Sequence, residues 1–356
     1  MKNYHKISLI LILVLLTTFV AGQDNYCNFN KSFPISRGTQ LRLINKFGDI
    51  NIITVKEDSI RICSTVSIEQ DDSDLLKKNI KLIKINTEKI QDTIYVSTLY
   101  DKKFFSDEYR TNRKSFRVDY LIKIPEYIDL NIKNEFGNVS LDELSGTFIL
   151  RLSQGNLNVK RLIKGNNKPV NTVFADHSKI IIEELNWMSL NVLNCPMVSI
   201  DKAQALVITS STSKINIGDI NSLVSFSTSD NYNIRSINNF ISESNYSSYE
   251  IGKLNLQLKS KTNFGSINIS DIAKSLNIID IVSGQSLISL KQGNDISFSS
   301  DMILTGVSVE FPPQKYPGLI RTDNYPTTTI AGITGSDKGT KSQIKIRATG
   351  GKVIIQ

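Results

Sequence analysis

The chain has 356 residues, of which 40% are hydrophobic and 21% charged, with a formal net charge of +8 at pH 7. Without Lys2 and Lys6, which belong to a predicted targeting segment, 40 basic residues face 34 acidic ones, and these charges are scattered along the sequence. The charge balance therefore gives no indication of a nucleic-acid partner, and the length is ample for one large repeat domain.

Residues 1–22 have the pattern of a signal peptide. A basic start is followed by a nearly unbroken apolar run over 7–20, and Val20-Ala21-Gly22 offers small residues for cleavage before Gln23. The run is about 14 residues, short of the roughly 20 that span a bilayer. We therefore expect an exported chain, periplasmic, outer-surface or secreted, without a transmembrane span after cleavage; an uncleaved anchor is the alternative.

Three cysteines remain after the signal segment, so at most one intrachain disulfide can form. Cys27 and Cys63 flank the first sequence repeat and are the predicted pair. Cys195 stands just before an apolar strand position and is predicted to be a buried core thiol. The absence of a C-x-x-C motif argues against a zinc or dithiol redox site.

Three segments nearly repeat one another, at 45–52, 134–141 and 262–269. Each reads Phe-Gly, then a small polar residue, then apolar-polar-apolar. That alternation is the period of a strand with one buried face. We expect the glycine before each strand to let the chain bend with a positive φ.

The same pattern recurs through the middle of the chain. Aligned on the first apolar position after the turn, the copies begin at Val139, Leu157, Ile180, Val198, Ile215, Tyr232, Tyr249, Ile267 and Leu287. Most steps are 17 or 18 residues, and a loop signal at 165–169 accounts for the longest. Most copies carry another apolar residue eight or nine positions upstream, so each unit holds two short strands and two bends.

One unit of this size cannot bury its own apolar face, whereas a stack of units can. The sequence therefore predicts an all-β fold, a parallel β-solenoid with coils about 4.8 Å apart, regular over 130–299. Steps held at 17 or 18 residues suit a winding chain better than the alternative, an antiparallel β-sandwich. Tyr232 and Tyr249 stand at the inward position, which favours packing in the core over the alternative, a sugar-contacting strip with Trp187.

Residues 23–129 are predicted to form an N-terminal cap and the first repeat, with an insert. The insert begins with a strand at 59–66, followed by a short helix over 71–78, where early acids precede lysines. Alternating runs at 93–100 and 116–124 are predicted to pair as a hairpin around the loop 101–115.

That loop interleaves basic and aromatic residues. They are Lys102, Lys103, Phe104, Phe105, Tyr109, Arg110 and Arg113. One interpretation is a binding tip for an anionic or glycan partner. The other, which we favour, is a solvated loop whose aromatic rings fold back onto the solenoid.

Residues 300–356 are predicted to form an irregular loop followed by capping strands. The irregular part contains Pro312, Pro313, Pro317 and Pro326. Alternating apolar residues over 344–355, interrupted by Gly350-Gly351, indicate a closing hairpin or final turn, which would protect the last strand from end-to-end aggregation.

Catalytic residues do not stand out on the face whose side chains can be predicted to point outward. That row reads Ser140, Asn158, Ile181, Ser199, Asn216, Asn233, Glu250, Asn268 and Ile288. One ionisable residue in nine suits hydrogen bonding to hydroxyl-rich partners rather than proton transfer. Asp176, His177 and Ser178 are adjacent, so their side chains cannot form a relay. We expect no catalytic residue, metal or cofactor.

The Phe-Gly repeats, the insert after the first copy, the run 120–125 leading into the second copy and the terminal segment 349–355 form an ordered pattern. Over most of residues 35–356 this pattern resembles the bacterial putative-adhesin family of β-solenoid repeat proteins. The resemblance implies an exported protein of stacked β coils with no assigned enzymatic activity, and it supplies no binding residues.

The sequence therefore supports a first hypothesis, a non-catalytic adhesin or envelope scaffold that binds a glycan or protein surface. A carbohydrate-active β-helix enzyme, of lyase or glycosidase type, is the second. An envelope signalling component with a membrane partner is the third.

Overall fold

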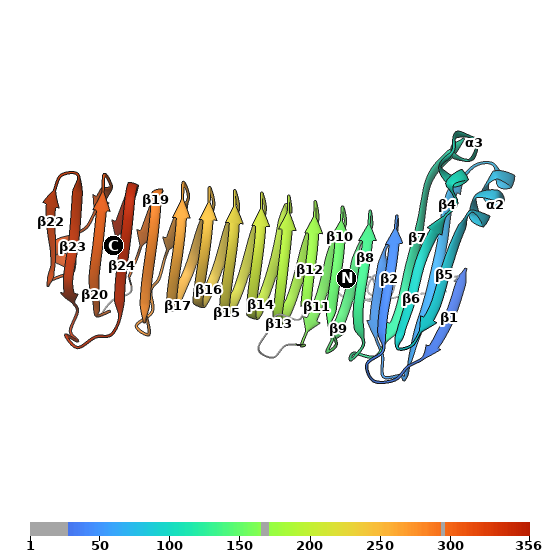
Figure 1. The fold of residues 1–356 in the computed structure, drawn as a ribbon, viewed down its shortest axis with the longest axis horizontal. Helices are drawn as coiled ribbons and strands as arrows, with labels where there is room; N and C mark the ends of the chain where they lie inside the picture. Colours follow the sequence, from blue (N-terminus) through green and yellow to red (C-terminus); the bar gives the residue numbers. More distant parts are fainter. Residues whose placement is uncertain (1–27, 165–170, 293–295) are drawn as a thin grey trace, which may run out of the picture.

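The computed structural model describes residues 28–164, 171–292 and 296–356. Over these residues the chain winds into an elongated stack of β coils (Figure 1). The signal segment, Cys27 and the loop 165–169 lie outside the described residues. Within the described part, every helix falls short of the length and apolarity that a membrane span requires.

Each coil has two sides. The first side contains β3 (Ile50–Thr54), β9 (Val139–Leu144) and β11 (Asn156–Leu162); the second contains β2 (Gln40–Lys46), β8 (Asp129–Glu135), β10 (Phe148–Ser153) and β12 (Asn171–Asp176). Five longer strands pass through both sides: β13 (Lys179–Leu193), β14 (Met197–Ser211), β15 (Lys214–Thr228), β16 (Asn231–Asn245) and β17 (Ser248–Asn263). All these neighbours pair in parallel, which confirms the solenoid and excludes the antiparallel sandwich.

The predicted alignment holds from Val139 to Ile267, because each aligned residue pairs with the next. The last position was wrong by one residue. Ile267 pairs with Ile288, which is buried, whereas Leu287 is 40% exposed. Two consecutive apolar residues hide the alternation there, and the outward position is therefore Ser289 rather than Ile288.

The bend between the two sides uses the residue before the glycine, not the glycine itself. Phe47, Phe136 and Phe264 have φ values of 62°, 58° and 53°, so the expectation of a positive φ at the glycine was wrong. The glycine is needed for space: a Cβ on Gly137 would lie 1.9 Å from the carbonyl oxygen of Gly48 in the neighbouring coil.

Hydrogen bonds between coils continue around the bend. The N–H of Phe136 donates to Ser153 O at 3.0 Å, and the N–H of Thr212 donates to Thr228 O at 3.1 Å. The left-handed conformation at these residues aims each N–H at the next coil. The ladder is therefore unbroken where the chain changes direction.

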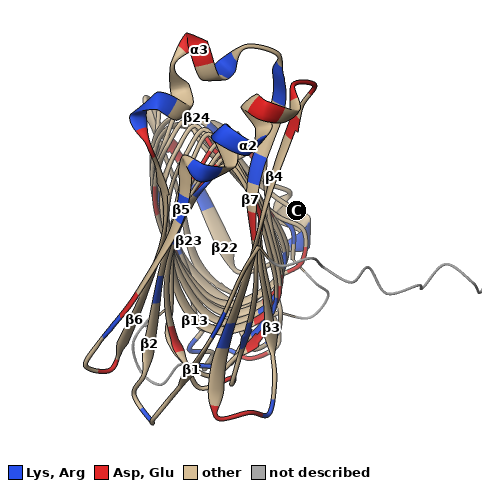
Figure 2. Ribbon diagram, turned by 90° about the vertical axis from the view of Figure 1, so that its right-hand side faces the viewer, with Lys and Arg blue, Asp and Glu red and all other residues tan. Residues whose placement is uncertain are grey.

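The insert builds the coil before the first repeat. Its elements are β4 (Ser59–Gln70), α2 (Ser73–Lys81), β5 (Ile83–Ile90), β6 (Thr93–Tyr100), η1 (Lys102–Phe105), α3 (Asp107–Arg110) and β7 (Arg113–Ile124). β6 pairs in parallel with β2 and β7 with β3, while β4, β5 and β1 (Phe29–Pro34) add antiparallel strands outside them. The helices α2 and α3 project beyond the bend edge (Figures 1 and 2).

The short helix was predicted correctly, with Asp72 as its N-cap accepting from the N–H groups of Asp74 and Leu75. The pairing of 93–100 with 116–124 was wrong. These strands lie on opposite sides of a coil, because the segment 101–112 crosses from one side to the other. The hairpin of the insert is instead β5–β6.

The C-terminal strand forms a complete coil, but this coil does not lie at the end of the stack. The remaining elements are β18 (Ser266–Ile269), β19 (Ile278–Leu290), β20 (Phe298–Thr305), β21 (Ser308–Glu310), η2 (Pro313–Lys315), β22 (Leu319–Asn324), β23 (Thr327–Thr334) and β24 (Gln343–Ile355). β24 lies between β19 on one side and β20 and β21 on the other. The antiparallel strands β20, β23 and β22 close the end, so part of the stretch predicted to be irregular forms the cap.

The interior is filled mainly by Ile, Leu and Val. Tyr232 and Tyr249 stack inside at 4.8 Å between ring centroids, as predicted from their inward position. Cys195 is a free, buried thiol whose pKa is raised by burial. Cys63 is engaged in a disulfide; its pairing with Cys27 stays a prediction, since Cys27 is outside the described residues.

We expect Gly137→Ala to destabilise the fold by about 3 kcal/mol, because the new Cβ meets backbone atoms that cannot move without breaking the ladder. The measurement is the shift in the midpoint of urea unfolding. Gly339→Ala is the control, since its Cβ would meet only Asp337 Oδ1, at 3.5 Å. Equal midpoints for both variants would contradict the close approach of coils at the bend.

Candidate binding groove

Two rows of side chains run along the solenoid on its second side, at the strand ends just before the bend. The first row stands three positions before each bend residue, and we call it the aromatic row after its two phenylalanines. Its residues are Lys133, Arg151, Phe174, Asn191, Thr209, Phe226 and Glu243. The bend row stands one position before it: Glu135, Ser153, Asp176, Leu193, Ser211, Thr228 and Asn245. The fixed parallel register keeps both rows in line.

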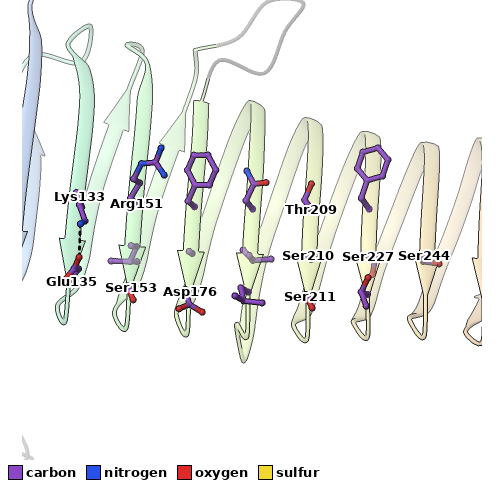
Figure 3. A pocket seen from close by; sticks show the side chains of 18 of the residues that line it. Lys133, Glu135, Arg151, Ser153, Asp176, Thr209, Ser210, Ser211, Ser227 and Ser244 are labelled. Atoms are coloured by element: carbon purple, nitrogen blue, oxygen red, sulfur yellow. Dashed lines mark ion pairs between the residues drawn. The ribbon is translucent and has the colours of Figure 1, made fainter.

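A groove of about 740 Å³ lies between the rows (Figure 3). Its floor consists of the buried residues between them: Asn134, Leu152, Ala175, Val192, Ser210, Ser227 and Ser244. Seven coils contribute, so the groove runs for roughly 29 Å at 4.8 Å per coil. Such a length suits an extended ligand rather than a compact one.

The centre and the ends of the groove differ in chemistry. In the centre, Phe226 and Leu193 are 45% and 47% exposed, and the uncharged side chains of Asn191 and Thr209 lie between Phe174 and Phe226 along the aromatic row. At one end Lys133 and Glu135 form an ion pair at 2.9 Å, and Glu243 stands at the other.

The floor is held from inside by a buried carboxylate. Asp230 Oδ2 accepts from the hydroxyls of Ser210 and Ser227, both at 2.7 Å, and from the N–H of Thr228 at 3.1 Å. Its Oδ1 accepts from the N–H of Ser213 at 2.7 Å. Four donors from two neighbouring coils satisfy this buried charge, which fixes the spacing of the floor.

The acidic residues of the groove are already engaged. Glu135 pairs with Lys133 and also with Lys46, and these hydrogen bonds hold the pKa of its carboxyl below the usual value. Asp176 contacts His177 Nδ1 at 2.7 Å. Among the residues that the structure describes, no group of three or more His, Cys, Asp or Glu side chains could hold a metal ion.

His177 occupies a bend, with a φ of 46°, as expected for a turn histidine. The hydroxyl of Ser178 donates to the backbone oxygen of Asp176, at 2.8 Å. The three adjacent residues therefore do not form a nucleophile relay.

The predicted loop 101–115 lies at the insert and contributes none of the residues that line the groove. Phe104 is buried, with its ring centroid 4.9 Å from that of Phe116. The Arg113 guanidinium lies 4.0 Å from the ring centroid of Phe104. Of the aromatic rings in the loop, that of Phe104 therefore packs back against the fold. The remaining residues are the exposed Lys102, Lys103, Phe105 and Arg110 and the half-buried Tyr109. A binding role for this loop stays a prediction.

The outward row predicted on the first side forms hydrogen bonds between coils. Ser140 donates to Asn51 at 2.8 Å, and Asn268 donates to Glu250 at 2.7 Å. The sequence analysis missed the groove because it predicted outward positions, from the alternation of apolar and polar residues, only for the strand after each bend. The same alternation, followed on the strand before each bend, gives both rows of the groove.

Fold and groove together define a parallel β-solenoid with an extended surface site. No protein-family model matches the chain, and no curated protein matches its sequence. Solved structures similar to it include the following three, each at a low TM-score.

The first is a putative adhesin from Parabacteroides merdae, 13% identical, covering 68% of this chain and 95% of that one, with a TM-score of 0.38. The second is a putative lipid binding protein from Parabacteroides distasonis, 10% identical, covering 69% and 97%, with a TM-score of 0.36. The third is a putative cell adhesion protein from Clostridium sporogenes, 13% identical, covering 92% and 97%, with a TM-score of 0.17.

We expect Asp230→Ala to lower the free energy of unfolding by about 3 kcal/mol, because four buried donors lose their acceptor. Asp219→Ala is the matched control: its carboxylate pairs with Arg235 at the surface, and its loss costs less than about 1 kcal/mol. Urea unfolding of both variants measures the difference. A small effect at Asp230 would mean that the carboxylate does not hold the groove floor.

Proposed function

We propose that this chain is a non-catalytic, exported binding protein, an adhesin or envelope scaffold, which holds an extended glycan or protein partner in the groove. The observation that carries the proposal is a groove of seven coils whose central walls, over β12–β15, include two phenyl rings and one charged side chain, Asp176, above a floor of buried, hydrogen-bonded residues. A preformed site of this kind loses little conformational entropy on binding. Export rests on the signal segment predicted at 1–22.

Binding is favoured over glycoside cleavage by the state of the carboxylates. Cleavage uses two carboxyl groups roughly 5–9.5 Å apart, one of them with a raised pKa so that it can donate a proton. Glu135 and Asp176 are two coils apart on the bend row, roughly 9.6 Å. The pKa of Glu135 is lowered, however, by Lys133 and then Lys46, which opposes proton donation.

We expect Thr209→Arg to weaken binding at least tenfold, because a long charged side chain at the middle of the aromatic row fills the groove. Asn233→Arg is the control, since Asn233 is also exposed but lies on the first side. The measurement is binding of the purified chain to a glycan array and to immobilised matrix proteins. Both sites are exposed, so both variants should unfold at the same urea concentration as the parent.

Equal binding by the two variants would contradict the groove as the site. A parallel assay for polysaccharide degradation tests the enzyme hypothesis. Reproducible depolymerisation by the parent chain, abolished by Glu135→Gln, would replace the non-catalytic proposal.

A further inference from the structure

The groove centre has a chemistry that narrows the class of ligand. We propose that the four coils from β12 to β15 bind a neutral glycan chain lying along the solenoid axis. This inference rests on the proposed function, and it adds which polymer is held and by which side chains.

The backbone of the groove floor is not available to a ligand. Each strand from β12 to β15 pairs on both sides with its neighbours in the stack. A peptide that adds a strand to a sheet needs an edge with free N–H and C=O groups. Here a ligand can be recognised only by side chains, which disfavours an extended peptide.

The charges of the centre disfavour an anionic polymer. Over β12–β15 the aromatic row reads Phe174, Asn191, Thr209 and Phe226, and the bend row reads Asp176, Leu193, Ser211 and Thr228. These eight positions carry one carboxylate and no lysine or arginine. On the next coil of the same row, Arg151 has its guanidinium 4.5 Å from the Phe174 ring centroid.

The uncharged side chains suit sugar hydroxyls. Asn191 and Thr209 can both donate and accept hydrogen bonds, as can Ser211 and Thr228 across the groove. Under an acyl chain these groups would lose water without gaining a partner, at a cost in free energy. A sugar chain offers hydroxyl groups along its edges and satisfies them.

The phenyl rings suit the C–H faces of pyranose rings. Phe174 and Phe226 stand on the same row three coils apart, about 14 Å. The amide of Asn191 and the hydroxyl of Thr209 lie between them. The site therefore spans several sugar rings, stacked on an aromatic side chain at each end and hydrogen-bonded in the middle.

The test measures binding of the full mature chain to neutral oligosaccharides derived from dextran, cellulose and mannan, from disaccharide to hexasaccharide, with sulfated dextran alongside. We expect affinity for at least one neutral series to rise with length. The double variant Phe174→Ala/Phe226→Ala should bind that series at least tenfold more weakly. Phe264→Ala is the control, since its ring is 55% exposed at a bend outside the groove, and it should bind like the parent.

Tighter binding of sulfated dextran than of every neutral series would overturn the inference. So would binding of no neutral series, or an equal loss in Phe264→Ala. In those cases the proposed function still stands if Thr209→Arg abolishes attachment to another partner. It falls as well if Thr209→Arg changes no binding at all. Thermal unfolding of each variant separates lost contacts from lost structure.

Discussion

The hydrogen-bond ladder between coils is the constraint on which the rest of this structure depends. It must continue where the chain reverses from one side of the coil to the other, and the left-handed bend residues allow it to do so. Their conformation costs about 1–2 kcal/mol for an L-residue. At Phe47 and Phe136 the cost is offset in part by rings that stack at 5.1 Å between centroids. Tyr246 and Phe264 repeat the arrangement seven coils further along.

The ladder also builds the groove, since a fixed register turns single positions into straight rows. A slip of one residue would exchange inward and outward side chains. It would remove Phe226 from the groove wall and expose Ser227, whose hydroxyl holds Asp230. The buried carboxylate therefore couples floor and wall: it requires serine hydroxyls at inward positions, and those positions fix which residues line the groove.

Much of this architecture could be predicted from the period of the sequence alone, because each coil repeats one alternation after one bend. The predictions that were wrong concern segments in which the period is ambiguous or absent. Leu287 and Ile288 are both apolar, so only the bend at Gln285 sets their register. The pairing of 93–100 with 116–124 was inferred from proximity in the sequence. In the structure β6 instead extends the sheet at β2 and β7 extends it at β3, both strands that come much earlier in the chain. The groove was missed because its two rows stand on the strand before each bend, whereas outward positions were predicted only for the strand after it.

The two ends of the solenoid are both closed by antiparallel strands. A parallel coil left open at an end would expose a full ladder edge, ready to template another chain. Here β24, the last strand in sequence, is enclosed between earlier coils, and the antiparallel strands β20, β23 and β22 follow it (Figure 1). The outermost strand, β22, is short and carries the charged pair Arg321 and Asp323. Because both ends carry antiparallel strands, the regular rows of side chains are exposed along the sides of the solenoid, and the two rows of the groove are among them.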